Sequence, residues 1–232
     1  HETVDEATII DWDRSDYDPY ARTKKFCEHM VHELLPDVST IVFRPSTVLG
    51  DSRFGETTQF DMVRAFVTLA NMPVLPFDRT WRMDIVPADY VAAGITTVHQ
   101  DDSPAYDSYN LSAGEASEPY HVIVDALVRA GQRSRPPVFA PRLEAPFGRI
   151  VDALAGAPRS SPVALPASLF KVFLPYLTYD TVFANDRIAQ ALGRKPAPFS
   201  SYAYPLFRFA SASKFRYPHT PWPDGVAHRT QP

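Results

Sequence analysis

Hydrophobic positions recur along the chain with two different periods, and these periods predict an alternation of helices and strands. Within residues 20–35, apolar side chains return every three to four positions, as at Phe26, Met30 and Leu34. This spacing predicts a helix with an apolar stripe that faces a core. The β-branched run at residues 40–43 instead predicts a short buried strand of a parallel sheet. A helix that leads directly into such a strand is typical of α/β proteins.

The residues that flank these two elements predict their boundaries. Asp18 is placed to cap the N-terminus of the helix, Pro19 suits its first turn, and Pro36 ends it. We expect Arg44 and Pro45 to end the strand, because proline lacks the N–H that a strand ladder uses.

The same alternation continues through the rest of the chain. We expect further helices within 60–72, 89–100, 117–130 and 181–193, and short extended pieces near 83–86 and 108–112. Asp89 is expected to cap its helix, and Gly131 to close another in a left-handed conformation. Prolines cluster after residue 135 and favour loops and short helices, and we expect residues 204–223 to form a loosely packed tail.

Composition then narrows the class of protein. With 45% hydrophobic and 22% charged residues the chain is globular, and a net charge of −4 without a basic block argues against a nucleic-acid partner. Cys27 is the only cysteine, which excludes an internal disulfide and a cysteine-based zinc site. The N-terminal residues do not resemble a signal peptide, and the apolar run at residues 169–177 is too short to span a bilayer. We therefore expect a cytoplasmic protein without a transmembrane segment.

One pair of residues on the first helix could carry acid–base chemistry. Tyr20 precedes Lys24 by four residues, so the two side chains share a helix face. A phenol is a weak acid at neutral pH, and a neighbouring ammonium group stabilises its phenolate. Such a pair can place a proton donor beside a carbonyl group. The alternative is an ordinary surface pair, because this spacing arises by chance in many helices.

Two other groups of polar residues have simpler explanations. His29 and His32 could be metal ligands, but they lie on the polar side of the first helix, where a solvated face is the commoner arrangement. Asp84 and Asp89 could form a pair of catalytic carboxylates, although capping is the usual role of an aspartate at the start of a helix. We expect no metal site.

Four segments in series resemble the extended short-chain dehydrogenase/reductase superfamily, most closely its thioester-reductase and fatty-acyl reductase branch. They are the helix with Tyr-x-x-x-Lys, then "RPSTVLGDSRFGETTQFDM", "MDIVPADYVAAGI" and "YNLSAG". The segment "LPYLTYDTVFANDRIAQALGRKPAPF" is also similar to the C-terminal part of such reductases. The resemblance extends over roughly residues 15–205.

The resemblance implies a role for each candidate site residue. Tyr20 would be the catalytic proton donor, and Lys24 would hold the nicotinamide ribose and stabilise the phenolate. The backbone of the residues after the strand would pass close to the nicotinamide carboxamide: Pro45, Ser46, Thr47 and Val48. The loop 51–57 would face the substrate, through Asp51, Ser52, Arg53 and Gly55.

The resemblance also implies a fold, a cofactor and a division into domains. The fold would be α/β, the C-terminal part of a Rossmann-type parallel sheet with a mostly helical substrate-binding lobe. Residues 1–50 and 85–112 would complete the dinucleotide-binding domain, and residues 51–84 and 113–232 would form the lobe and tail. The cofactor would be NADP or NAD, and the reaction the reduction of an acyl thioester or aldehyde carbonyl. The substrate would be a small molecule or a carrier-bound acyl group.

One feature of the family has no counterpart in this sequence. The family binds the pyrophosphate at a Gly-rich turn, but residues 1–232 contain no Gly-x-x-Gly-x-x-Gly, and the first glycine is Gly50. The catalytic Ser or Thr of the family is also unassigned, because Thr3, Thr8 and Ser15 do not follow a convincing strand. The sequence is therefore expected to be a fragment without the nucleotide-binding half. A nucleotide-sugar epimerase or dehydratase, a non-catalytic lobe and a homo-oligomer remain open alternatives.

Overall fold

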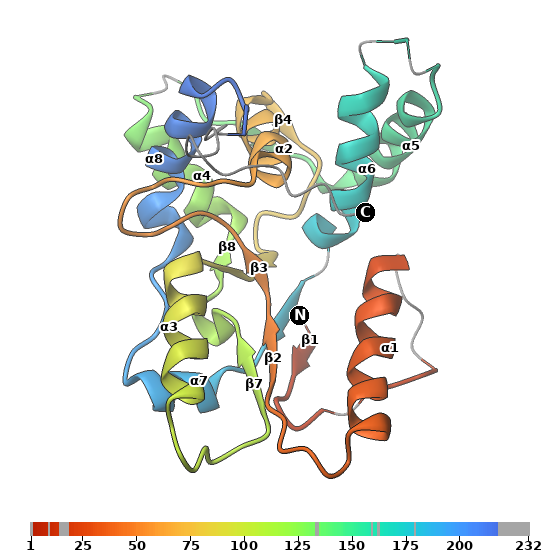
Figure 1. The fold of residues 1–232 in the computed structure, drawn as a ribbon. Helices are drawn as coiled ribbons and strands as arrows, with labels where there is room; N and C mark the ends of the chain where they lie inside the picture. Colours follow the sequence, from red (N-terminus) through yellow and green to blue (C-terminus); the bar gives the residue numbers. More distant parts are fainter. Residues whose placement is uncertain are drawn as a thin grey trace, which may run out of the picture.

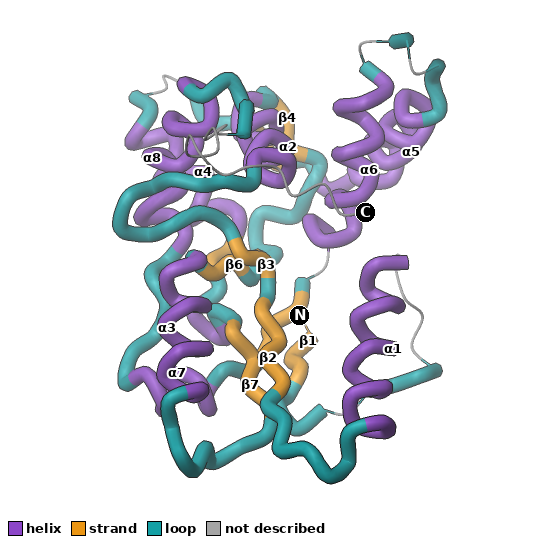
Figure 2. The backbone as a smooth tube through the Cα atoms, viewed as in Figure 1, coloured by secondary structure: helices purple, strands orange, loops and turns teal. Residues whose placement is uncertain are grey.

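The chain adopts a mixed α/β fold with a strand-containing part and a helical part (Figure 1). The structure is a computed structural model that describes residues 2–8, 10–13, 19–132, 135–158, 160–161, 163–178 and 180–217. Most of the strands lie in the middle of the molecule, with helices on either side, and β4 lies beside α2 (Figure 2). The predicted α/β class is confirmed.

Two parallel strand pairs form the centre of the strand-containing part. β2 (Val42–Pro45) pairs with β7 (Ser108–Leu111), and β1 (Glu2–Val4) pairs with β10 (Thr181–Phe183). The prediction of a parallel strand is thus confirmed, but its boundaries were wrong, because the strand begins at Val42 and includes Pro45. Val42 donates its N–H to the carbonyl of Asp107, just before β7, at 2.8 Å, and Ser46 donates to the Leu111 carbonyl at 3.1 Å. Alternate residues of a strand face alternate edges, so the nitrogen of Pro45 lies on the opposite edge, and the β2–β7 ladder loses no hydrogen bond.

Helices lie on both sides of these strands. In Figure 1, β2 and β7 lie between α1 (Pro19–Leu34) and the pair α3 (Ala88–His99) and α7 (Asp186–Leu192). Buried apolar residues join α3 and α7 to β7: Val86, Tyr90, Val98, Tyr109, Leu111, Ala113 and Ile188. The prediction of a helix over residues 181–193 was partly wrong. Its first residues form β10, because Thr181 and Val182 are buried and pair with β1.

The first helix is present but is not covered. It ends at Leu34, close to the predicted end, and none of its residues is buried. Phe26 is 52% exposed and Leu34 is 67% exposed, so the predicted apolar stripe does not face a core formed by the described residues. The predicted cap residue Asp18 lies outside the described residues.

A second apolar core holds the helical part together. It contains residues of α2 (Phe60–Asn71), α4 (Tyr120–Ala130) and α8 (Phe199–Ala212), with α5 (Glu144–Ala155) packed against α6 (Ala164–Thr178). The prediction of a loose tail was wrong for residues 204–212, which belong to α8. Tyr202, Leu206, Phe207 and Ala210 are buried, because apolar residues there recur at helical spacing. Residues 218–232 lie outside the described part.

Short elements connect the two parts. β3 (Thr47–Val48) pairs with β6 (Ile85–Val86) and β4 (Val74–Leu75) with β9 (Val138–Phe139), both parallel, and β5 (Arg82–Met83) pairs antiparallel with β8 (Glu118–Pro119). The single-turn helices are η1 (Gly114–Ala116) and η2 (Pro141–Leu143). The left-handed cap predicted at Gly131 was wrong, since its φ is −83°, whereas Gly193 ends α7 with a φ of 62°.

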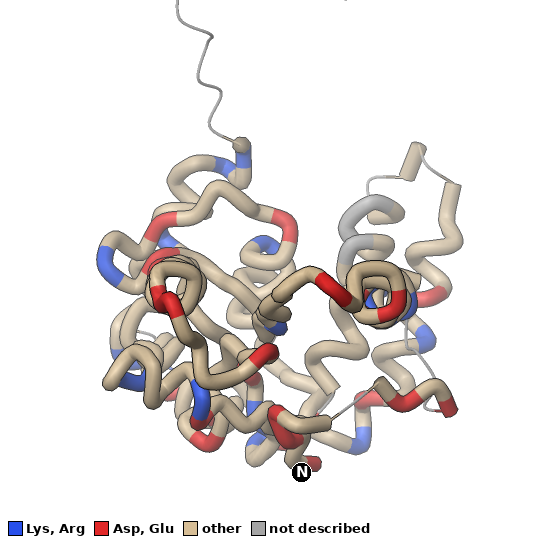
Figure 3. The backbone as a smooth tube through the Cα atoms, turned by 60° about the horizontal axis from the view of Figure 1, so that its bottom comes forward, with Lys and Arg blue, Asp and Glu red and all other residues tan. Residues whose placement is uncertain are grey.

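Charged residues of both signs are distributed over the molecule. Figure 3 shows Lys and Arg positions interspersed with Asp and Glu positions along the chain. Within the described ranges, no helix combines the length and the hydrophobicity needed to cross a bilayer.

Candidate active site

Tyr20 and Lys24 lie together near the N-terminal end of α1. The Nζ atom of Lys24 is 5.4 Å from the centroid of the Tyr20 ring, and Tyr20 is 64% exposed. In Figure 1, this end of α1 and the carboxyl end of β2 lie toward the same end of the strands. In open α/β sheets, ligands bind outside the carboxyl ends of the strands. The pair is therefore accessible and lies at the end of the sheet where such ligands bind.

Residues 45–48 form a crossing between two strand pairs. Ser46 donates its N–H to the Leu111 carbonyl at 3.1 Å, and the next residue, Thr47, donates to the Asp84 carbonyl at 3.2 Å. The chain thus leaves β7 and joins β6 within one residue. This crossing, which we call the strap, is held by backbone hydrogen bonds and lies at the carboxyl end of β2.

A buried carboxylate lies beside the strap. Asp84 is only 9% exposed, and its Oδ1 accepts the N–H of Ala113 at 2.7 Å. Burial raises the pKa of Asp84, and the Ala113 N–H and the nearby Ser46 side chain oppose this rise. Neither Ser46 Oγ nor Asp84 Oδ2 has a partner at normal hydrogen-bond geometry. The Ala113 N–H therefore lowers the pKa of Asp84 more than the Ser46 side chain does. Asp84 therefore helps to hold the strap against the end of β7.

We expect Asp84→Asn to change how stability depends on pH. Because the pKa of Asp84 is higher in the folded than in the unfolded protein, the folded state binds more protons between the two values. Asp84 therefore makes the wild type lose stability as pH rises from about 4. The asparagine side chain keeps an acceptor for Ala113 but cannot ionise. In urea unfolding, the free energy of unfolding of the variant relative to wild type should increase with pH, up to the raised pKa of Asp84 in the folded protein.

The exposed Asp125 provides the control for this experiment. Asp125→Asn makes the same substitution at an exposed position and reports the effect of the amide itself. A difference for Asp84→Asn that does not change with pH would contradict the assignment.

The expected substrate loop 51–57 is held in place by two helices. Asp89 of α3 accepts hydrogen bonds from Ser52, at 2.8 Å to the N–H and 2.9 Å to the Oγ. Asp89 was predicted to cap α3, and this was wrong. The helix begins after Pro87, and Asp89 lies in the first turn, with its carboxylate directed to the loop. Gly55 has a φ of +62°, and a Cβ atom there would lie 2.6 Å from the Cβ of Pro205 in α8. Only glycine fits this close contact without strain.

Within this loop, an ion pair keeps one carboxylate charged. Arg53 Nη2 is 2.8 Å from Asp51 Oδ2, and the hydrogen bond from this side chain lowers the pKa of Asp51. The guanidinium group of Arg53 also lies 5.1 Å from the centroid of the Phe54 ring, and Phe54 is 67% exposed. The loop thus presents a cation and an aromatic ring to solvent.

The remaining candidates from the sequence are the two histidines of α1 and the Ser and Thr residues that precede Tyr20. His29 packs edge-on against Trp12, with ring centroids 5.1 Å apart, and His32 is exposed. No cluster of three potential metal ligands occurs in the part of the chain that the structure describes. Thr3 lies within β1, Thr8 follows it, and Ser15 is outside the described residues.

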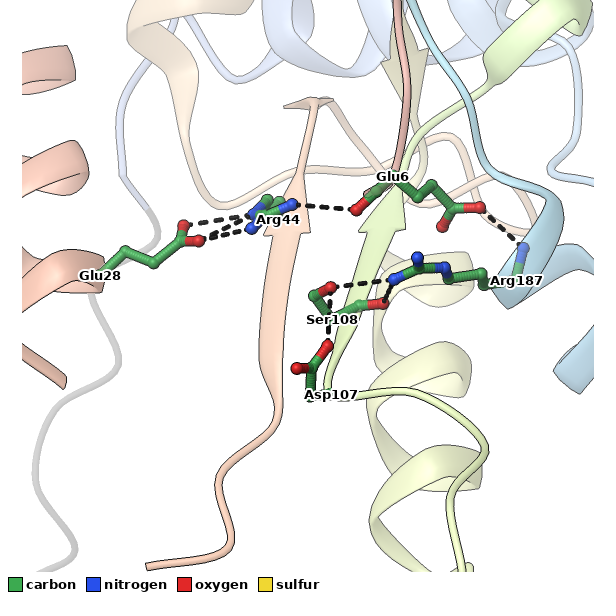
Figure 4. A network of polar contacts seen from close by, with 6 residues as sticks. All are labelled: Glu6, Glu28, Arg44, Asp107, Ser108 and Arg187. Atoms are coloured by element: carbon green, nitrogen blue, oxygen red, sulfur yellow. Dashed lines mark hydrogen bonds and ion pairs between the residues drawn. The ribbon is translucent and has the colours of Figure 1, made fainter. Parts of the chain in front are cut away.

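Glu28 and Arg44 connect α1 to the strand-containing part, and the sequence analysis selected neither as a site residue. Arg44 was interpreted as a strand terminator and Glu28 only as a neighbour of histidines. Arg44 Nη2 lies 2.5 Å from Glu28 Oε1, and Arg44 Nε lies 3.1 Å from the same oxygen (Figure 4). The available signal was the position of Glu28, four residues after Lys24 and on the same helix face.

Comparisons with known proteins agree with the resemblance read from the sequence. Residues 3–95 match the model of the NAD_binding_4 family, described as male sterility protein. No curated protein matches the chain significantly. The terminal R domain from the myxalamid PKS-NRPS biosynthetic pathway is similar in structure, with a TM-score of 0.68 at 18% identity, over 92% of this chain and 55% of that chain.

Two further solved structures show the same fold. A thiolation-reductase di-domain from an archaeal non-ribosomal peptide synthetase has a TM-score of 0.65 at 15% identity, over 92% of this chain and 44% of that chain. UDP-glucuronic acid 4-epimerase from Bacillus cereus, in complex with NAD, has a TM-score of 0.56 at 13% identity, over 91% and 57% of the two chains. The chain thus spans about half the length of these proteins. These solved structures, all at most 18% identical to this chain, share its fold.

Proposed function

We propose that this chain, whose residues 3–95 match the male sterility protein family, is the C-terminal part of an NAD(P)H-dependent reductase. The substrate would be an acyl thioester or an aldehyde. The observation that supports this most directly is the placement of Tyr20 and Lys24. They are in contact, exposed, and located toward the carboxyl end of a parallel strand.

The residues present suit the nicotinamide end of such a cofactor. Tyr20 and Lys24 offer a hydroxyl and an ammonium group at the surface, and the strap 45–48 would bring its backbone close to the nicotinamide carboxamide. When bound, the cofactor would supply a hydride to the carbonyl carbon. Tyr20 would donate a proton to the carbonyl oxygen, and Lys24 would hold the ribose hydroxyls and stabilise the phenolate that remains.

The substrate would bind beside the loop 51–57. Asp51, Ser52, Arg53 and Gly55 stay in our assignment because α3 and α8 hold the loop in a defined shape. A carrier-bound acyl group is a suitable substrate class, since a similar solved structure is a thiolation-reductase di-domain. We propose the division into residues 1–50 with 85–112 and residues 51–84 with 113–232. β10 and α7 belong to the second group but pack against the first.

An epimerase or dehydratase acting on a nucleotide sugar is the second candidate. It is supported by the structural similarity to UDP-glucuronic acid 4-epimerase. A full-length protein that contains residues 1–232 should distinguish the two. The reductase would oxidise NADPH or NADH when an acyl thioester is added, whereas the epimerase would convert a nucleotide sugar with no net consumption of NAD. Failure of both assays would favour the non-catalytic alternative.

Residues 1–232 alone should have negligible affinity for NADPH. The strap and the Tyr20–Lys24 pair would contact only the nicotinamide end, and no Gly-rich turn for the pyrophosphate occurs in this sequence. Titration calorimetry on residues 1–232 should therefore show no heat of binding. Micromolar affinity would contradict the assignment of the pyrophosphate site to a segment outside this sequence.

A further inference from the structure

Among the described residues, an ion pair between Glu28 and Arg44 joins α1 to the central strands. Arg44 approaches the Glu28 carboxylate with both Nε and Nη2, and the two side chains are only 29% and 17% exposed. A guanidinium group that donates two hydrogen bonds to one carboxylate fixes orientation as well as distance. This geometry is more restrictive than that of a solvent-exposed lysine–carboxylate pair.

Apolar packing does little to hold α1 in place. No residue of α1 is buried in the described structure, and Phe26 remains 52% exposed. The helix also contacts the Trp12 ring. The centroid of this ring lies 5.1 Å from that of the His29 ring, edge-on, and 5.3 Å from Lys25 Nζ. With no buried side chain in α1, the Glu28–Arg44 pair is one of the described contacts that fix the position of α1 along the strands.

Arg44 is itself held by the strand-containing part (Figure 4). Its Nη1 donates to the Glu6 carbonyl at 3.4 Å. The buried Glu6 carboxylate accepts the N–H groups of Asn110 in β7, at 3.2 Å, and Arg187 in α7, at 2.9 Å. Arg187 Nη1 also donates to the Ser108 carbonyl at 2.9 Å. The guanidinium group of Arg44 is thus tied, through Glu6, to β7 and α7.

The pair also joins the two segments that are expected to contact the nicotinamide end of the cofactor. Tyr20, Lys24 and Glu28 follow one another at four-residue intervals and therefore share one face of α1. Arg44 immediately precedes Pro45, the first residue of the strap. A shift of α1 along β2 would move the Tyr20 hydroxyl and the Lys24 ammonium group relative to the strap.

We propose that Glu28 and Arg44 are positioning residues that set the register of the acid–base helix against the strap. The proposal rests on the proposed reductase function. In an enzyme, a displacement of about 1 Å at the reacting groups can lower the rate by roughly 10²-fold. Because Asp89 and α8 hold the loop 51–57, substrate binding should depend little on this pair.

The test uses a full-length reductase that contains residues 1–232, with the variants Glu28→Gln, Arg44→Met and the double variant. Each single change should lower kcat by up to about 10²-fold and leave KM for the acyl thioester nearly unchanged. The double variant should be no worse than the worse single variant, because both changes break the same contact. Arg44→Lys should restore part of the loss, since lysine keeps the charge but not the two-point geometry.

Hydrogen exchange provides a readout that does not depend on activity. The amides of α1 should exchange faster in Glu28→Gln and Arg44→Met, while those of β7 should stay protected, which shows that the variants are folded. Glu33→Gln, the same substitution at an exposed position of the same helix, is the matched control and should change neither exchange nor kcat.

The outcomes separate this proposal from the reductase assignment. If Tyr20→Phe abolishes turnover while Glu28→Gln and Arg44→Met retain wild-type kcat, the positioning role is wrong and the reductase function stands. Additive losses in the double variant, or unchanged exchange of α1, would also overturn the positioning role. If Tyr20→Phe retains turnover, the reductase mechanism fails, and the positioning role fails with it.

Discussion

Replacing Tyr20 with phenylalanine is expected to lower the turnover of the full-length reductase by about 10²–10⁴-fold, the usual contribution of a positioned general acid. The substitution keeps the aromatic ring beside Lys24 and removes only the hydroxyl that would protonate the carbonyl oxygen. Cofactor binding should hardly change, because this hydroxyl would be one contact among many. Steady-state rates with an acyl thioester, together with the Kd for NADPH, measure the two effects separately.

Lys24→Met should have a different signature. It removes both the contact to the ribose and the positive charge 5.4 Å from the Tyr20 ring, so cofactor affinity and turnover should fall together. The comparison of the two variants is more informative than either variant alone. A general loss of structure would lower both kcat and cofactor affinity in both variants, whereas Tyr20→Phe should lower kcat only.

Two surface residues provide matched controls. Tyr106→Phe removes a hydroxyl from a tyrosine that is 41% exposed, and Lys171→Met removes an ammonium group that is paired with Asp152 at 2.9 Å in the helical part. Neither change should affect kcat or the Kd for NADPH. A Tyr20→Phe enzyme that retains most of its turnover would show that Tyr20 and Lys24 are an ordinary surface pair.

Leu206→Ala is expected to destabilise the protein by about 2–5 kcal/mol, the range observed when a large aliphatic side chain is removed from a core. Leu206 lies on α8 and is fully buried, and its side-chain methyl groups would lie 2.8 Å and 2.9 Å from a Cβ atom placed at Gly50. The substitution therefore leaves a cavity between α8 and the chain that enters the loop 51–57. Urea unfolding followed by circular dichroism measures the loss.

Ser211→Ala is the control for this variant, because Ser211 lies on the same helix and is exposed. It should change the free energy of unfolding by less than about 0.5 kcal/mol. A loss below about 1 kcal/mol for Leu206→Ala would mean that α8 contributes little to the core, in conflict with its burial.

The expected catalytic residues were identified from local sequence because their relation is local. Four residues on a helix fix the relative position of Tyr20 and Lys24 whatever the rest of the chain does. The strap was expected from the resemblance to the reductase family. The mutual placement of the expected catalytic pair and the strap was not predictable in this way, since the described contacts between α1 and β2 include the pairing of Arg44 with Glu28, 16 positions apart in sequence.

Burial was predicted less well than helix formation. The period of apolar residues indicated the helix at residues 19–34, yet the structure leaves Phe26 and Leu34 exposed. The opposite error occurred at residues 204–212, where the mixture of aromatic and basic residues suggested a loose tail. The apolar spacing that buries Leu206 and Ala210 was nevertheless present in the sequence.

The sequence by itself determined the α/β class, the parallel strand at β2, the helices α1 to α4 and the pairing of Tyr20 with Lys24. These features depend on residue periodicity and on spacings within one or two turns, which a chain carries before it folds. Only the tertiary structure decided which apolar faces are covered, that Asp89 holds Ser52, that Asp84 is buried beside the strap, and that Arg44 joins α1 to the strands. These contacts join residues far apart in sequence, so their energies depend on a geometry that no local pattern records.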